Sequence, residues 1–318
     1  MTPGFQADNR RLEARRHLKP LLQVNHIIDG YTRITTTTFT SPGNTINVRV
    51  WKWCRKRVAE MLSNTAEMID RPISENIDAL DEKETRQCVL DHCNEVMSTK
   101  PAEGRVEWAL EHLPQQHILT SSFGVQAAVS LHLVTRYAPN IPVIFIDTGY
   151  QFQETYQFVD ELAERFSLNL KIYRSQTSPA WQEARYGQRW SQDLNALDAY
   201  NQENKVEPMQ RALRKLEVGT WYAGLRRDQA ISRENVPYLS WSGNRWKVHP
   251  IADWTDRDVY LYLKKNDLPY HPLWERGYIS IGDTHTTKPL HAVDHRDQTR
   301  FFGLKRECGL HEIDLSSL

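Results

Sequence analysis

The sequence predicts an α/β fold, a mostly parallel, twisted sheet with helices on both faces, and two observations support this prediction. From about residue 75 onward, short apolar runs alternate with stretches of helical periodicity. The run at 141–146 is apolar throughout, which is typical of a strand buried on both faces. The 318 residues, 40% hydrophobic and 25% charged, describe an ordinary globular protein large enough to bury its own core.

The predicted elements follow in order along the chain. Apolar residues at helical spacing predict helices at 76–97, 106–113, 125–137, 152–166, 205–216 and 256–265. Short apolar runs predict strands at 117–121, 141–146, 168–173, 220–225 and 246–251. The connector after the third strand, with Trp181 and Trp190, is expected to be mostly helical, and Thr255 is a capping residue for the last helix. The nucleotide-binding α/β domain is expected to span 75–290.

Two loops follow strands that such a sheet would place near its ligand-binding edge. The loop of Ser121, Ser122, Phe123, Gly124 and Gln126 opens a helix, whose backbone N–H groups and dipole attract an anion. A Ser-Ser turn that merely caps the helix has the same composition.

The second loop is Asp147-Thr148-Gly149, where the glycine lets a ligand approach the backbone. A plain strand-to-helix turn with an Asp cap is the alternative.

A third cluster, Arg226, Arg227 and Arg233, follows the fourth strand. Guanidinium groups bind phosphate or sulfate through paired hydrogen bonds, although a surface ion-pair network is the alternative. Three such clusters at three strand ends make an anionic nucleotide the most economical ligand.

The C-terminal segment carries a different chemistry. Cys308 stands near Lys305, Arg306 and His311, a setting that lowers a thiol pKa and favours a thiolate nucleophile. We expect residues 291–318 to form a mobile tail that closes over substrate. A frayed tail with an idle thiol is the alternative.

The first 60 residues carry eleven basic and four acidic residues, an excess of seven positive charges in a chain of zero net charge. We expect residues 1–70 to be a poorly structured, basic N-terminal extension. Three interpretations stay open: a flexible basic arm, a targeting segment, or leader sequence from a start codon placed upstream of Met61 or Met68.

The remaining global features favour a cytoplasmic protein. No apolar stretch is long enough to cross a membrane, and the N-terminus lacks a secretory pattern. The four cysteines, Cys54, Cys88, Cys93 and Cys308, are expected to be free thiols; Cys88 and Cys93 fall on the first predicted helix and are expected to be packing or surface residues.

Five segments together resemble the phosphoadenylyl-sulfate (PAPS) reductases that depend on thioredoxin. They are the loop 120–126, the run 141–149, the segment 221–227, the block 282–287 and the tail 307–311, in the same order over roughly residues 76–312. The resemblance implies an adenine-nucleotide α-hydrolase-like (Rossmann-like) fold. Related ATP pyrophosphatases have a Ser-Gly-Gly-x-Asp-Ser loop, whereas this chain has Ser-Ser-Phe-Gly-Val-Gln, and the missing acid fits a protein that binds a nucleotide without splitting ATP.

The resemblance also implies a mechanism and partners. Cys308 would attack the sulfonyl sulfur of PAPS and release adenosine 3′,5′-bisphosphate, while Arg226, Arg227, Lys305 and Arg306 would neutralise the developing charge. Reduced thioredoxin or glutaredoxin would then release sulfite from the S-sulfocysteine. A homodimer is implied as well, with no nucleic acid and no membrane as partner.

No bound cofactor is expected. The related adenylyl-sulfate reductases hold an iron-sulfur cluster with an adjacent Cys-Cys pair and a Cys-x-x-Cys, and this chain has neither pattern. His291 and His295 have helical spacing for a zinc site, but the mechanism needs no metal.

Two other functions stay open from the residues alone. Another enzyme of this fold, such as a sulfurylase subunit or a nucleotide-splitting ligase, would consume ATP and would not depend on Cys308. A non-catalytic nucleotide sensor could use the basic first 60 residues to contact nucleic acid.

Overall fold

The structure of this protein is a computed structural model, and it describes residues 83–303. The predicted extension at 1–70, and Cys54, Lys305, Arg306, Cys308 and His311, lie outside the described residues. Of the predicted tail at 291–318, only the part up to Gly303 is described.

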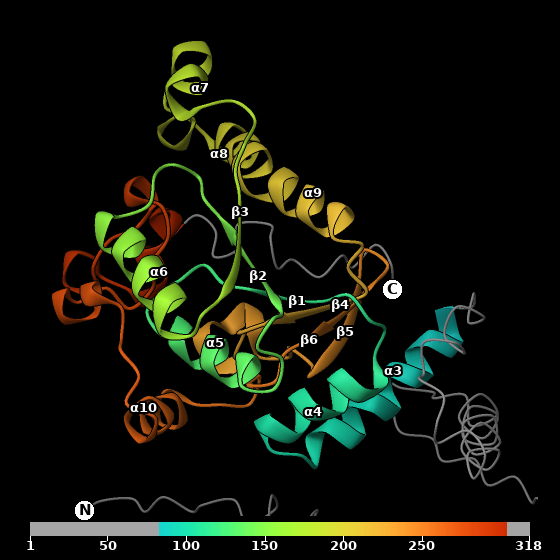
Figure 1. The fold of residues 1–318 in the computed structure, drawn as a ribbon. Helices are drawn as coiled ribbons and strands as arrows, with labels where there is room; N and C mark the ends of the chain where they lie inside the picture. The colour runs from blue at the N-terminus through green and yellow to red at the C-terminus, as the bar shows by residue number, and fades with distance from the viewer. Residues whose placement is uncertain (1–82, 304–318) are drawn as a thin grey trace, which may run out of the picture. The chain divides into compact units, whose positions relative to one another are not determined.

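A six-stranded sheet forms the centre of the described chain, with the order β3-β2-β1-β4-β6-β5 (Figure 1). The strands are β1 (His117–Thr120), β2 (Pro142–Ile146), β3 (Asn169–Tyr173), β4 (Thr220–Ala223), β5 (Leu239–Ser242) and β6 (Arg245–Val248). All neighbouring strands pair in parallel except β5 and β6, which pair antiparallel. The prediction of a mostly parallel sheet is therefore confirmed, and β5 is a sixth strand that it did not include.

Eight α-helices surround this sheet within the described residues. They are α3 (Lys83–Ser98), α4 (Ala102–His112), α5 (Ala127–Thr135), α6 (Gln153–Arg165), α7 (Pro179–Tyr186), α8 (Leu194–Asn201), α9 (Glu207–Lys215) and α10 (Asp256–Lys265). A π-helical turn, η5 (Gln202–Val206), joins α8 to α9. The connector after β3 is helical, as predicted.

The alternation of side chains along the strands places helices on both faces. In β1, Leu119 belongs to the large core that includes residues of α3, α4, α5, α6 and α10. Its neighbour Ile118 points to the other face and packs with Met209 and Leu213 of α9. Figure 1 shows the same division, with α5 and α6 on one side of the strands and α9 on the other. Both faces of the central strands are buried, because residues i and i+1 of a strand point in opposite directions.

Helix α10 begins where the sequence predicts. The Thr255 hydroxyl accepts a hydrogen bond from the Asp258 N–H (3.2 Å), and the Asp258 carboxylate accepts one from the Thr255 N–H (2.8 Å). This capping box satisfies two N–H groups that a helix start leaves without partners. It also fixes the first turn of α10, which carries Asp256 toward the loop after β4.

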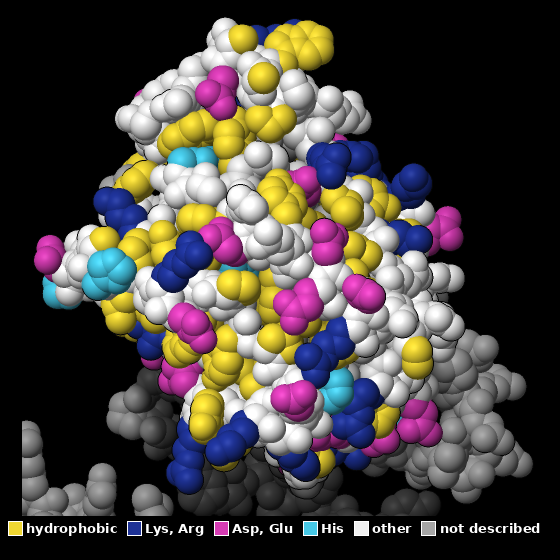
Figure 2. Space-filling model, turned by 60° about the vertical axis from the view of Figure 1, so that its left-hand side comes forward, with side chains coloured by type: hydrophobic (Ala, Val, Ile, Leu, Met, Phe, Trp, Pro, Cys, Tyr) yellow, Lys and Arg dark blue, Asp and Glu magenta, His cyan; other side chains and the backbone are white. Residues whose placement is uncertain are grey.

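The helix α7 carries exposed apolar side chains. Trp181 is 57% exposed, and the Arg185 guanidinium lies 4.5 Å from its ring centroid. In Figure 2, apolar and basic groups gather at the upper end of the view, where α7 lies in Figure 1. Over the rest of that face, acidic, basic and apolar groups are interspersed. Among the described helices, none is both long and apolar enough to span a bilayer.

Candidate anion-binding site

A cavity of about 460 Å³ opens at the carboxyl ends of the strands. The chain builds β1, β2 and β3 in one direction across the sheet and then places β4 on the other side of β1, so the strand order reverses between β1 and β4. Ligands of open α/β sheets bind at such a switch point, and a cavity of this size suits a small molecule. Residues that follow β1, β2 and β4 line this cavity.

The loop after β1 contributes Ser121, Ser122, Gly124 and Gln126 to the cavity wall. The first turn of α5 follows directly, and no side chain caps it. The Ala127 and Val129 N–H groups donate to the Gly124 and Gln126 carbonyls (3.0 and 3.2 Å), so it is the positive end of the helix dipole that favours an anion here.

Phe123, also predicted as a site residue, does not line the cavity. Its side chain is fully buried and packs edge-on against Phe145, with ring centroids 5.3 Å apart. Its backbone has φ of +48°, and its N–H donates to the Ser121 hydroxyl (3.0 Å). Phe123 thus anchors the loop to the hydrophobic core.

In the loop after β2, one predicted residue lines the cavity and the other two contact neighbouring elements. Thr148 lines the cavity. Asp147 does not: its carboxylate accepts from the Tyr156 hydroxyl (2.7 Å) and pairs with the Arg174 guanidinium (2.8 Å). Gly149 has φ of +79°, and a Cβ there would lie 2.6 Å from the Pro179 ring. Asp147 and Gly149 thus connect the turn after β2 to α6 and to the segment after β3, and the Asp cap of the alternative interpretation is not formed, because no side chain caps α6.

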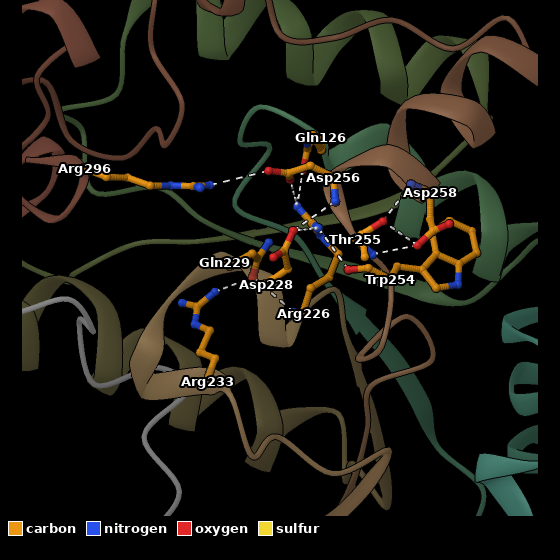
Figure 3. Close-up of polar contacts among 10 residues, drawn as sticks. All are labelled: Gln126, Arg226, Asp228, Gln229, Arg233, Trp254, Thr255, Asp256, Asp258 and Arg296. Carbon is orange, nitrogen blue, oxygen red and sulfur yellow. Dashed lines mark hydrogen bonds and ion pairs between the residues drawn. The ribbon is translucent and has the colours of Figure 1, made fainter. Parts of the chain in front are cut away.

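Arg226, after β4, is the centre of a polar network on one wall of the cavity (Figure 3). Its side chain is buried, and its guanidinium donates to the Gln126 side-chain oxygen (2.7 Å) and to the Asp256 carboxylate (2.7 Å). Burial of Asp256 works against its charge, but the hydrogen bond and the charge of Arg226 hold the pKa of Asp256 below its usual value. The network therefore joins the β1 loop, the β4 loop and α10.

Of the other two predicted arginines, one lines the cavity and the other does not. Arg233 lines the cavity and donates to the Gln229 side-chain oxygen (2.5 Å). Arg227 does not line it: its guanidinium donates to the Val236 carbonyl (2.8 Å) and lies over the Tyr238 ring. Of the predicted cluster, the structure brings together Arg226 and Arg233.

Lys205 and Asp283 are cavity-lining residues that the sequence analysis did not single out as site residues. The Lys205 ammonium lies 2.6 Å from the Asp283 carboxylate, and both side chains are buried. The sequence does contain an indication of this role: Lys205 occupies a position on the apolar face of the predicted helix 205–216, where a lysine is rare.

Arg296 and Arg300 also line the cavity and were not predicted. Arg296 lies 3.7 Å from the Asp256 carboxylate. Arg300 donates to the Ile281 carbonyl (2.9 Å), and its guanidinium occupies the space where a Cβ at Gly282 would lie. Both come from a segment without strong periodicity, so no sequence pattern indicates that they lie at the sheet.

The charges around the cavity favour an anionic ligand. Among the described residues that line it, five are basic, namely Lys205, Arg226, Arg233, Arg296 and Arg300, and two are acidic, namely Asp256 and Asp283. Such an arrangement raises the local concentration of anions and holds phosphate or sulfate oxygens through charge-assisted hydrogen bonds.

The thiols on α3 lie away from this chemistry. Cys93 is buried in the core, and this burial raises the pKa of its thiol to about 12, so it stays protonated at neutral pH. Cys88 is half-buried on the same helix. Over residues 83–303, no group of three or more His, Cys, Asp or Glu side chains is arranged to hold a metal ion.

Comparison with known proteins gives a consistent result. Residues 116–289 match the phosphoadenosine phosphosulfate reductase domain. The chain is 56% identical over 229 residues to the phosphoadenosine 5′-phosphosulfate reductase of Proteus mirabilis, covering 72% of this chain and 94% of that protein. It is 58% identical over 231 residues to the enzyme of the same name from Sodalis glossinidius, covering 73% and 95%. The crystal structure of Candida auris PAPS reductase in a phosphate complex superposes with a TM-score of 0.56 at 30% identity, over 63% of this chain and 96% of that one.

Proposed function

The chain belongs to the phosphoadenosine phosphosulfate reductase family, and on this premise we propose that it reduces PAPS to sulfite and adenosine 3′,5′-bisphosphate with reduced thioredoxin or glutaredoxin as electron donor. The observation that carries the proposal is the cavity at the strand switch point, with five basic side chains and an uncapped helix start. A doubly phosphorylated nucleotide with a sulfate group matches that excess of positive charge.

The proposed chemistry begins at Cys308. Its thiolate attacks the sulfur of PAPS, an S–S bond forms, and the bond from sulfur to the phosphate oxygen breaks. Adenosine 3′,5′-bisphosphate leaves, and Cys308 holds an S-sulfocysteine. Arg226, Lys205 and the tail cations Lys305 and Arg306 stabilise the negative charge on the leaving oxygens.

The second stage uses two electrons from the donor dithiol. One donor thiolate attacks the Cys308 sulfur, sulfite leaves, and a mixed disulfide forms. The second donor thiol resolves this disulfide and restores the Cys308 thiol. Because the tail has no second cysteine beside Cys308, the resolving thiol comes from the donor.

Sulfite release from PAPS and reduced thioredoxin tests the proposal. The wild type is expected to release sulfite, and Cys308→Ser is expected to lose the activity by at least about a thousandfold. Cys88→Ser is the matched control and is expected to retain activity, because Cys88 lies on α3 and does not line the cavity. After PAPS is added without donor, mass spectrometry is expected to find a single SO₃ adduct on the tail peptide.

Three outcomes would contradict this function. Sulfite release by Cys308→Ser at the wild-type rate would reject the nucleophile. Consumption of ATP would favour a nucleotide-splitting ligase or sulfurylase. An absorption band of an iron-sulfur centre in the purified protein would contradict the proposal that the reaction needs no bound cofactor.

We further propose that the enzyme acts in assimilatory sulfate reduction in the cytoplasm. We also propose that it assembles as a homodimer, and light scattering on the purified protein tests this oligomeric state. Residues 1–70 are proposed to lie outside the catalytic unit. A chain that starts at Met61 is expected to keep full activity, and loss of folding on this truncation would contradict the domain boundaries.

A further inference from the structure

Asp283 holds three polar groups from different elements at one point beside the cavity. One of its carboxylate oxygens lies 2.6 Å from the Lys205 ammonium and 3.1 Å from the Tyr200 hydroxyl. The other accepts a hydrogen bond from the Thr148 hydroxyl (2.6 Å). The side chain of Asp283 is 1% exposed, and that of Lys205 is 7% exposed. A carboxylate in this position is costly to bury and would repel an anionic ligand, so its presence needs an explanation.

Lys205 reaches this point because of the helical segment that carries it. Buried residues recur at three- and four-residue intervals from α8 through η5 into α9, and Lys205 belongs to this stripe. The π-helical turn η5 is a local irregularity of the kind found at functional sites. The ammonium also lies 5.0 Å from the centroid of the Phe301 ring and 5.4 Å from that of the Tyr200 ring, distances at which an aromatic ring attracts a cation.

We propose that Asp283 is a positioning residue for the anion site, which holds the Lys205 ammonium at the cavity wall through their ion pair and is itself held by the Thr148 hydroxyl. This inference rests on the proposed function, because that function supplies the phosphate and sulfate oxygens of PAPS as the anion that Lys205 binds. Because an ammonium has three N–H donors, Lys205 can bind Asp283 and a ligand oxygen at the same time. Thr148 donates its hydroxyl proton to Asp283 and accepts from the Tyr150 N–H (3.3 Å), so it fixes the carboxylate in place.

The pH dependence of the reaction can report on this pair. The titratable side chains beside it are Tyr150 from the loop before α6, Tyr200 from α8 and His285 from η9 (Thr284–Thr286). The Glu183 carboxylate of α7 lies behind them and accepts from the Tyr150 hydroxyl (2.5 Å). Burial raises the pKa of Tyr150 and of Tyr200, and burial lowers the pKa of His285 to about 4. None of these three side chains changes charge between about pH 6 and pH 9, and the Cys308 and donor thiols are the same in wild type and variant. An alkaline limb that is present only in the variant therefore belongs to Lys205.

The test compares the pH profile of kcat/KM for sulfite release in wild type and in Asp283→Asn. The asparagine keeps the shape of the side chain and a hydrogen bond to Thr148, but it removes the charge. The buried ammonium then lacks a counter-charge and loses its proton at a lower pH. We expect kcat/KM to fall by about tenfold or more near pH 8.5 and by clearly less near pH 6.5.

Two variants separate this role from a merely structural one. Asp256→Asn is the matched control, because Asp256 also pairs with a cation of the cavity wall, but that cation is Arg226, which does not lose its proton in this range. It is expected to change kcat/KM without a new alkaline limb. In Asp283→Asn/Lys205→Arg, the guanidinium stays charged, so the alkaline limb is expected to disappear.

The outcomes distinguish the inference from the function on which it rests. If the wild type releases no sulfite from PAPS, the proposed function fails. If the wild type is active and Asp283→Asn has the wild-type kcat/KM and the wild-type alkaline limb, the positioning role is wrong. A uniform loss of activity at all pH values, with the same alkaline limb as wild type, would also overturn it, because it would assign Asp283 a structural role.

Discussion

Among single residues, some buried charged side chains stabilise the fold, whereas others line the cavity. Arg105 of α4 is a scaffold example: its guanidinium binds the Asp253 carboxylate at 2.6 and 2.8 Å and lies 4.0 Å from the Tyr238 ring centroid. It also donates to the carbonyls of Met97 and Pro250. It thereby ties α3 and α4 to the turn before α10, away from the cavity lining.

We predict that Arg105→Ala lowers the free energy of unfolding by about 2–3 kcal/mol at pH 7 and leaves the KM for PAPS unchanged in the folded protein. Arg105 holds the pKa of Asp253 below its usual value, although burial opposes it. A carboxylate with a depressed pKa stabilises the fold above about pH 4, and this contribution is lost as the pH falls through the folded-state value. The difference between wild type and variant in urea unfolding is therefore expected to narrow at low pH. An equal difference at both pH values would contradict the role of the ion pair.

The residue scale also shows how far the sequence could predict the site. Ser121, Gly124, Thr148 and Arg226 were predicted because they follow strands, and the structure places all four at the cavity. Lys205 lies on the π-helical turn η5, and its sequence pattern does not show that this segment packs against the cavity. Phe123 shows the opposite case: it lies inside the predicted loop, but its apolar ring packs into the core.

At the scale of elements, the start of α10 connects stability to the site. Thr255→Ala removes the capping box and is expected to lower the free energy of unfolding by about 1 kcal/mol. Thr255→Ser retains the hydroxyl and is expected to stay near wild type. Thermal or urea unfolding of the three proteins checks this, and equal stability of the alanine and serine variants would contradict the capping role.

The contact between the end of β4 and α5 gives a second prediction at this scale. A Cβ at Gly224 would lie 2.3 Å from the Ser130 hydroxyl, and both residues line the cavity. Gly224→Ala is expected to push β4 and α5 apart and to lower kcat/KM for PAPS by about tenfold. Gly224→Ala/Ser130→Ala is expected to recover part of this loss, because the hydroxyl is gone. No recovery in the double variant would show that the steric conflict lies elsewhere.

Among the elements, β5 shows where sequence patterns were insufficient. The other five strands were predicted from apolar runs, but Leu239–Ser242 alternates apolar and polar residues over only four positions. The hairpin turn between β5 and β6 contains Gly243 and Asn244, both with positive φ. Glycine and asparagine between two short runs are a hairpin signal, and this signal could have identified the strand.

At the scale of the whole molecule, the excess of positive charge around the cavity predicts how ligand and salt act on stability. Adenosine 3′,5′-bisphosphate at about 100 times its Kd is expected to stabilise the protein by about 2.7 kcal/mol. At a fixed ligand concentration, the rise in Tm is expected to shrink as salt increases, because the ligand is held by charge. Adenosine serves as the control and is expected to give a small, salt-independent rise. A salt-independent rise with the bisphosphate would contradict binding by the five basic side chains.

The cavity wall draws on chain positions as far apart as Thr120 and Phe301. Contacts between segments so distant in sequence form slowly, because the intervening chain loses much freedom when they meet. During refolding from urea, the helices and the first strand pairs are therefore expected to return before the protein can hold a nucleotide. A chain that is synthesised only as far as residue 290 lacks Arg296 and Arg300 of the cavity wall, so ligand binding can stabilise the fold only late in synthesis.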